Sequence, residues 1–142
     1  RLSPVTPAND ASDPHPQALF EHLARQLGPL QLAYLHVIEG QTGGARDFKQ
    51  GDAPFDYLAL RVAYARAGGK GAWMLNNGYS RELAIDSIAA GKADLIAFGR
   101  PFISTPDLVH RLMDNLPLNE LQADKLYGGG AEGYTDYPSL SA

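Results

Sequence analysis

The sequence contains no cysteine, which excludes disulfide bonds, thiolate metal sites and a cysteine nucleophile. It also lacks long hydrophobic runs: its apolar stretches last only a few residues, whereas a membrane helix needs about 20. The N-terminal region carries proline and aspartate where a signal peptide would be apolar. We therefore expect a soluble protein, and because a chain without cysteine is compatible with a reducing compartment, we expect a cytoplasmic location.

Strong positive charge is missing as well. The 142 residues include 12 Lys and Arg against 16 Asp and Glu, for a net charge of −4, and the basic residues are scattered along the chain. A nucleic-acid-binding protein concentrates its basic residues on one face or in one run. The composition therefore argues against nucleic acid as a partner and is compatible with a small phosphorylated ligand.

Metal-ligand and acid–base patterns are also absent. The histidines, His15, His22, His36 and His110, have no metal-ligand spacing with one another or with carboxylates, so no metal site is predicted. We expect His15, His22 and His110 at the surface, and His36 in the core or facing a barrel interior with a satisfied partner. No pair of carboxylates suggests general acid–base catalysis, and no catalytic residue is assigned.

What the chain does contain is a repeated alternation of strands and helices. Strands are expected at 1–5, 32–38, 71–75 and 93–98, the second of them buried on both sides. Helices are expected from the capping signal Ser12-Asp13-Pro14 to Gly28, at 55–67, at 81–90 after Ser80, and from the cap at 105–107 through Leu112.

This alternation predicts parallel strands with helical crossovers. The two architectures that satisfy it are a small doubly wound α/β sheet and half of a (β/α)8 barrel, since a whole barrel takes about 250 residues. In the second case the chain supplies the second half of the barrel. The segment 39–54 is long for a simple connector and contains several glycines, as functional loops often do.

Candidate site residues follow the expected strands, because ligands of such folds bind at the carboxyl ends of strands. Asn77 and Gly78 follow the third strand, and Gly99 and Arg100 follow the fourth. Glycine lets backbone N–H groups approach a phosphate, and a guanidinium matches its oxygens. An ordinary Asn-Gly turn and a surface ion pair explain each motif alone; the two together favour a phosphate site.

Arg1 is a different kind of candidate. At the end of the first expected strand it would reach over the mouth of a barrel and stabilise an anion, or else belong to a disordered terminus. The C-terminal segment is rich in glycine and contains Tyr127, Tyr134 and Tyr137. Tyr134 and Tyr137 fit a strap that covers the barrel, and Tyr127 fits a pocket residue.

Two motifs carry a family resemblance. They are Phe98-Gly99-Arg100-Pro101-Phe102-Ile103 and Tyr127-Gly128-Gly129-Gly130-Ala131-Glu132-Gly133-Tyr134-Thr135-Asp136-Tyr137-Pro138. Both resemble the C-terminal signature of the old yellow enzyme family, in particular its bacterial N-ethylmaleimide reductase and ene-reductase branch. The opening Arg1-Leu2-Ser3-Pro4 resembles the end of the family's fifth barrel strand, so the resemblance covers essentially the whole chain.

The resemblance implies an FMN-dependent (β/α)8 barrel that takes hydride from NAD(P)H and reduces activated C=C bonds of enones, maleimides or nitro compounds. It implies a place beside the flavin for Arg1, which would stabilise the reduced anionic ring. It implies that Asn77, Gly78, Gly99 and Arg100 hold the FMN phosphate. Tyr127 corresponds to an aromatic residue on the substrate side of the flavin.

The same resemblance implies that part of the active site lies elsewhere. Family members bind the substrate oxygen through a His/Asn or His/His pair and protonate the product with a Tyr, all from the first half of the barrel, and no histidine of this chain matches them. We expect residues 1–142 to form strands five to eight with their helices, followed by the Gly/Tyr-rich tail at 126–142. Such a half-barrel needs its N-terminal half, a second copy or a rearranged topology.

Two other functions remain open from the sequence. One is a non-catalytic flavin- or phosphate-binding half-barrel that dimerises or complements a partner fragment. The other is a doubly wound domain whose Asn-Gly and Gly-Arg turns bind nothing.

Overall fold

The structure is a computed structural model that describes residues 1–7, 12–42, 44–47, 54–127 and 129–140. It is an α/β arrangement of two compact units, Arg1–Ala97 and Phe98–Ala142, which we describe one at a time. Parts of the expected loop 39–54 and of the Gly/Tyr-rich tail lie outside the described residues. None of the described helices has the length and hydrophobicity needed to cross a lipid bilayer.

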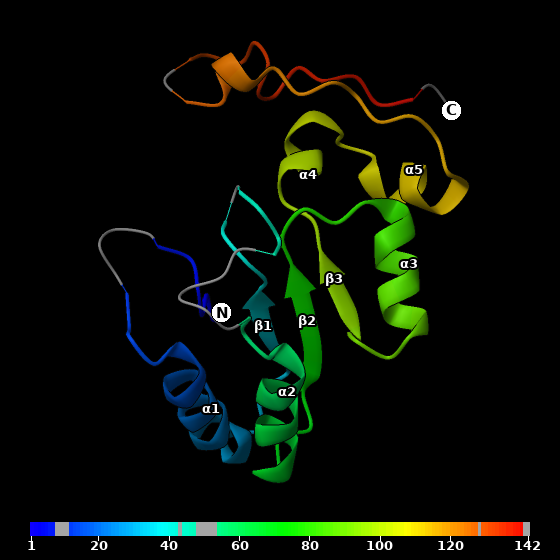
Figure 1. The fold of residues 1–142 in the computed structure, drawn as a ribbon. Helices are drawn as coiled ribbons and strands as arrows, with labels where there is room; N and C mark the ends of the chain where they lie inside the picture. The colour runs from blue at the N-terminus through cyan, green and yellow to red at the C-terminus, as the bar shows by residue number, and fades with distance from the viewer. Residues whose placement is uncertain (8–11, 43, 48–53, 128, 141–142) are drawn as a thin grey trace. The chain divides into compact units, whose positions relative to one another are not determined.

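The first unit is built on a parallel sheet. Its strands are β1 (Tyr34–Ile38), β2 (Ala72–Asn76) and β3 (Leu95–Ala97), in the order β1-β2-β3 (Figure 1). The N-terminal segment adds a parallel bridge between Leu2 and Val37 on the other side of β1. The predicted parallel order is therefore confirmed, although the first expected strand is reduced to this bridge in the described chain.

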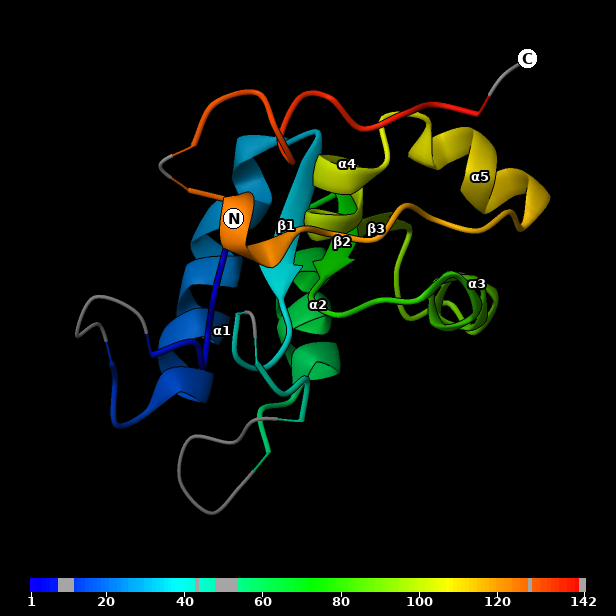
Figure 2. The same cartoon turned by 90° about the horizontal axis from the view of Figure 1, so that it is seen from above.

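Three helices accompany the sheet: α1 (Pro16–Leu27), α2 (Tyr57–Arg66) and α3 (Arg81–Ala89). Figure 2 shows them arranged around one side of the sheet in chain order. The predicted start of the first helix at Ser12-Asp13-Pro14 is wrong by two residues. The Asp13 carboxylate accepts a hydrogen bond of 2.7 Å from the backbone N–H of His15, so it stabilises a turn before the helix rather than capping it.

Only one face of the sheet is fully buried, so the expectation of a strand covered on both sides is wrong. Leu35 and Val37 of β1 are 3% and 0% exposed, and Trp73 of β2 packs beside the Tyr64 ring of α2, with centroids 6.3 Å apart. On the opposite face His36 is half-buried and aligned with Met74 and Leu95, the last of which is 43% exposed. Among the described residues of the first unit, the side chains on that second face are less buried than those that pack against α2.

The last strand is shorter than the predicted range 93–98 because Asp94 is used differently. Its carboxylate accepts hydrogen bonds from the backbone N–H of Trp73 at 2.7 Å and from the Arg61 guanidinium at 2.8 Å. The side chain thus joins α2 to the start of β2, and regular pairing begins at Leu95.

The second unit contains α4 (Arg100–Ser104), α5 (Leu108–Asp114) and a short 3-10 turn at Ala123–Lys125. No helix is predicted at 100–104, yet α4 forms there; its second residue is Pro101, and proline is tolerated in the first turn of a helix, where its missing N–H costs nothing. The helix predicted to run through Leu112 starts and ends about two residues later than expected.

Arg111 of α5 organises this unit. Its side chain is only 4% exposed and donates hydrogen bonds of 2.8 to 3.1 Å to Asp107, Pro117, Asn119 and Pro138. The carboxylate of Asp107 compensates its charge, and the two proline carbonyls tie both the segment after α5 and the C-terminal tail to the helix.

A glycine at the end of α1 gives a test of how closely the helices pack. A Cβ on Gly28 would lie 2.6 Å from the Ala67 Cβ and 2.8 Å from its carbonyl oxygen. Helix propensity alone would favour Gly28→Ala by about 1 kcal/mol. We expect the opposite, a loss of about 1–3 kcal/mol in the free energy of unfolding, because the overpacked helices must move apart. Urea denaturation measures it, with Gly130→Ala as the control in open space.

Candidate functional site

The carboxyl ends of β1 and β2 line one side of a cavity, together with the N-terminal segment and α1. It has a volume of about 490 Å³, and its lining includes Arg1, Thr6, Ile38, Thr42 and Asn76. The lining thus includes both the exposed first residue, Arg1, and the last residue of β2, Asn76. This places one predicted site residue, Arg1, beside the strand end that leads into two others, Asn77 and Gly78.

The turn after β2 has an unusual backbone. Asn77 has a φ of +108° and Gly78 a φ of +62°. The Asn77 side chain is buried and donates hydrogen bonds to the Glu39 carbonyl at 2.6 Å and the Gln41 carbonyl at 2.9 Å. Gly78 itself is exposed. The buried amide thus holds a strained turn in which the neighbouring glycine faces outward, as an anion-binding turn requires.

Three residues that the sequence did not single out complete this edge of the sheet: Glu39, Arg46 and Tyr79. The Arg46 guanidinium pairs with the Glu39 carboxylate at 2.7 Å, donates a second hydrogen bond to the Asn77 carbonyl, and lies 4.0 Å above the Tyr79 ring. The Tyr79 hydroxyl donates to the same Glu39 oxygen at 2.6 Å. Arg46 comes from the loop after β1, so this contact joins the ends of two strands.

The protonation state of Tyr79 follows from its surroundings. Burial and the hydrogen bond to the Glu39 carboxylate raise the pKa of Tyr79 above its ordinary value. The hydroxyl therefore remains a donor at neutral pH. The nearby Tyr57 hydroxyl, whose pKa burial also raises, accepts a hydrogen bond of 2.7 Å from the backbone N–H of Gly40.

The remaining predicted residues belong to the second unit. Gly99 is exposed, precedes α4, and has no atom within 4 Å of the place where a Cβ would stand. Arg100 is exposed as the first residue of α4, and among the described residues its guanidinium has no ion pair. The Tyr127 side chain is 91% exposed. Among the described residues of this unit, no contact explains the glycine at 99, the arginine at 100 or the exposed aromatic ring at 127.

The histidines follow the prediction in part. His15, His22 and His110 are exposed, as expected. His36 lies on the half-covered face of the sheet, and its Nε2 is buried without a hydrogen-bond partner in the described chain, which contradicts the expected satisfied partner. Burial and the charge of Arg1 lower the pKa of His36, so the ring is neutral at physiological pH. Within the described ranges no group of three or more His, Asp and Glu side chains could hold a metal ion.

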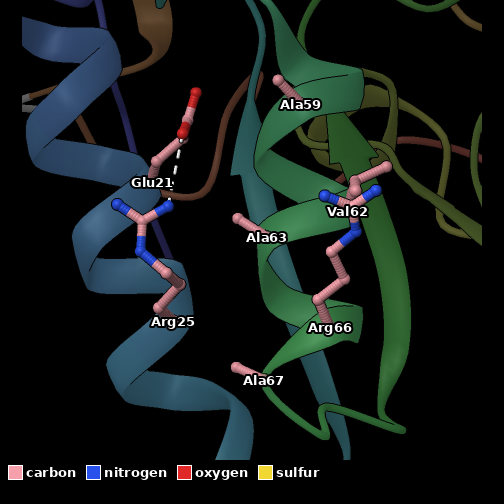
Figure 3. A pocket seen from close by; sticks show the side chains of 7 residues that line it. All are labelled: Glu21, Arg25, Ala59, Val62, Ala63, Arg66 and Ala67. Carbon is pink, nitrogen blue, oxygen red and sulfur yellow. Dashed lines mark hydrogen bonds and ion pairs between the residues drawn. The ribbon is translucent and has the colours of Figure 1, made fainter.

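A second hollow lies between α1 and α2 (Figure 3). Ala59, Ala63 and Ala67 of α2 leave space there, and on the α1 side Arg25 is paired with Glu21, one turn earlier on the same helix, at 3.3 Å. Its lining comes from helices and not from strand ends, and its one ion pair is solvent-exposed. It is a consequence of small side chains at the helix contact.

The sequence matches a family model and known proteins. Residues 1–119 match the NADH:flavin oxidoreductase / NADH oxidase family. 12-Oxophytodienoate reductase 7 of Oryza sativa subsp. japonica is 36% identical over 99% of this chain and 37% of its own length. A Leishmania infantum protein named "Probable flavin mononucleotide-dependent alkene reductase" is 33% identical over 99% of the chain and 35% of its own length.

The fold is similar to that of a solved old yellow enzyme homologue. The old yellow enzyme homologue from Zymomonas mobilis superposes with a TM-score of 0.83 at 34% identity, covering 99% of this chain and 38% of that structure. The chain thus spans about a third of the length of the relatives it matches.

The strained turn after β2 gives a second test. Asn77→Ala removes the two hydrogen bonds to the loop after β1 and keeps the unfavourable φ, so we expect the free energy of unfolding to fall by about 2 kcal/mol or more. Asn77→Gly removes the same bonds but relieves the backbone, and should cost clearly less. Equal losses in urea denaturation would show that the backbone at residue 77 carries no strain.

Proposed function

Because the chain belongs to the NADH:flavin oxidoreductase / NADH oxidase family, we propose that it forms strands five to eight of a (β/α)8 barrel. In this role it supplies the phosphate-binding half of an FMN-dependent ene reductase, which takes hydride from NAD(P)H and reduces activated C=C bonds of enones, maleimides or nitro compounds. The observation that carries the proposal is the buried Asn77 amide holding an exposed glycine turn at the carboxyl edge of a parallel sheet.

The uncovered face of the sheet supports the half-barrel. His36, Met74 and Leu95 line up across three strands on that face, and they are more exposed than their neighbours on the helix-covered face. The buried Nε2 of His36 needs a donor or acceptor that the described chain does not supply. In a closed barrel this face points into the interior, where side chains from the other strands fill the space.

The residues at the strand ends fit a phosphate. Gly78 and Gly99 are exposed and lack side chains, so backbone N–H groups there can approach an anion closely. Arg100 offers a guanidinium with no ion pair in the part of the chain that is described, and such a group binds phosphate oxygens bidentately. Together these groups would hold the FMN phosphate, with Asn77 fixing the turn.

Two further residues would act on the ring and the substrate. When bound, FMN supplies the hydride transfer between the nicotinamide and the alkene. The Arg1 side chain would place positive charge at the edge of the flavin ring and so stabilise its reduced form. Tyr127 would provide an aromatic wall for the substrate, which gives a reason for its 91% exposure.

The groups that bind the substrate oxygen and donate the proton are proposed to lie outside this chain. This part of the proposal rests on the resemblance, in which these groups come from the first half of the barrel; among the described residues the buried polar ones include no acid. The partner is therefore the N-terminal half of the same barrel, and a second copy of this chain would provide a flavin-binding but inactive assembly.

Complementation tests this division. We expect the chain alone to show no alkene reduction, and co-expression with residues that form strands one to four to give flavin absorbance and NAD(P)H-dependent reduction of an enone. Size-exclusion chromatography distinguishes a complemented barrel from a pair of identical chains. Turnover by the isolated chain would contradict the proposal.

Arg100 tests the phosphate assignment in the complemented protein. Arg100→Ala should weaken FMN binding by about 2 kcal/mol, because a charge-assisted contact to the phosphate is lost. Arg66→Ala, an exposed arginine on α2, is the matched control and should leave FMN binding unchanged. Flavin fluorescence quenching gives the dissociation constants, and equal affinity of both variants would remove Arg100 from the site.

A further inference from the structure

Arg46 links the loop after β1 to the turn after β2. One guanidinium nitrogen is 2.7 Å from the Glu39 carboxylate and another donates to the Asn77 carbonyl, while the plane of the group covers the Tyr79 ring. Tyr79 is 8% exposed and donates its hydroxyl back to Glu39. We call Glu39, Arg46 and Tyr79 the clamp.

The clamp touches the proposed phosphate turn directly. A Cβ on Gly78 would lie 3.4 Å from Cγ and Cδ of Arg46, so the arginine stem packs beside the turn. Three hydrogen bonds hold Asn77: Arg46 donates to its carbonyl, and its side-chain amide donates to the Glu39 and Gln41 carbonyls. The backbone of Asn77 stays at a φ of +108°, which a free turn would leave.

The positive charge of Arg46 is already neutralised within the protein. Glu39 neutralises it at 2.7 Å, and the side chains of both partners are mostly buried, at 29% and 17% exposure. Each guanidinium contact with the protein also removes a donor that a phosphate would need. Arg46 is therefore poorly placed to act as a second phosphate counter-ion.

We infer that the clamp is a positioning device that sets the 77–78 turn in its anion-binding shape before the FMN phosphate arrives. This inference rests on the proposed function, because the phosphate is the ligand that the turn would receive. Rigidity of the turn increases affinity by removing the cost of ordering it on binding. Arg46 acts through Asn77 and Gly78, and Tyr79 acts by locking Glu39 onto Arg46.

The first test compares FMN with riboflavin, which lacks the phosphate, in the complemented barrel. Arg46→Met should weaken FMN binding by about tenfold and leave riboflavin binding unchanged. Arg46→Lys should be nearly as weak, because one ammonium cannot span both Glu39 and the Asn77 carbonyl. Arg66→Met is the matched control and should bind both flavins like the wild type. Full FMN affinity in Arg46→Lys would overturn the inference in favour of a simple charge effect.

A second variant distinguishes a positioning role of Arg46 from direct binding of the phosphate by its charge, because the two roles predict opposite changes in FMN affinity. Glu39→Gln removes the negative charge that neutralises Arg46. If Arg46 bound the phosphate, this change would strengthen FMN binding; because it holds the turn, we expect weaker FMN binding, and Tyr79→Phe should show a smaller loss of the same sign. Stronger binding by Glu39→Gln would overturn the clamp.

A third measurement needs no flavin. Amide hydrogen exchange at residues 77–79 of the flavin-free protein should accelerate by about tenfold in Arg46→Met and remain at the wild-type rate in Arg66→Met. Unchanged exchange would overturn the clamp even where FMN binding is normal. A wild-type protein that binds FMN no better than riboflavin would instead overturn the phosphate site of the proposed function, and with it the ligand named for the turn, whatever the exchange rates show.

Discussion

The parallel register of the sheet is the constraint on which the rest of this chain depends. Ile38 pairs with Asn76, and Asn76 pairs with Ala97, so the segments that follow the strands start side by side. The pairing continues one step beyond the sheet, where the Glu39 N–H donates to the Asn76 carbonyl at 3.0 Å. This last ladder bond brings Glu39 beside Asn77 and Tyr79, although the residues are about 40 positions apart in the sequence.

The strands and their order could be predicted because each combines a short apolar run with glycine or proline boundaries. The ends of the helices were harder to predict, because they depend on which hydrogen bonds a polar side chain forms in the folded chain. Asp13 and Asp94 both look like ordinary turn or strand residues, yet one stabilises the turn before α1 and the other ties α2 to β2. Two-sided burial was predicted wrongly because apolar composition does not reveal whether the second covering layer belongs to the same chain.

The residues of the candidate site also fall into those that the sequence could indicate and those that it could not. Asn77, Gly78, Gly99 and Arg100 could be proposed from the sequence because the Asn-Gly and Gly-Arg pairs stand directly after expected strands, and their role in binding stays a prediction. Glu39, Arg46 and Tyr79 could not, because a lone arginine in a loop has no pattern of its own. The role of Arg46 depends on the Glu39 carboxylate and the Tyr79 ring, which lie elsewhere in the sequence. The only available signal is an acidic residue directly after one strand, together with a tyrosine in the turn after the neighbouring parallel strand.

The location of the clamp also bears on which part of the proposed enzyme would bind the phosphate and which part would enclose the flavin and the substrate. Among the described residues, the hydrogen bonds that hold Asn77 in the 77–78 turn come from Glu39, Gln41 and Arg46, all in the loop between β1 and α2. In the proposed half-barrel, the open sheet face and the Nε2 of His36, which has no hydrogen-bond partner among the described residues, would need residues from the other half. Holding a phosphate would then be a local property of consecutive β/α units, whereas enclosing a flavin ring and a substrate would be a property of the closed barrel. On this proposal, phosphate recognition would form before the barrel closes, and closure would add the chemistry.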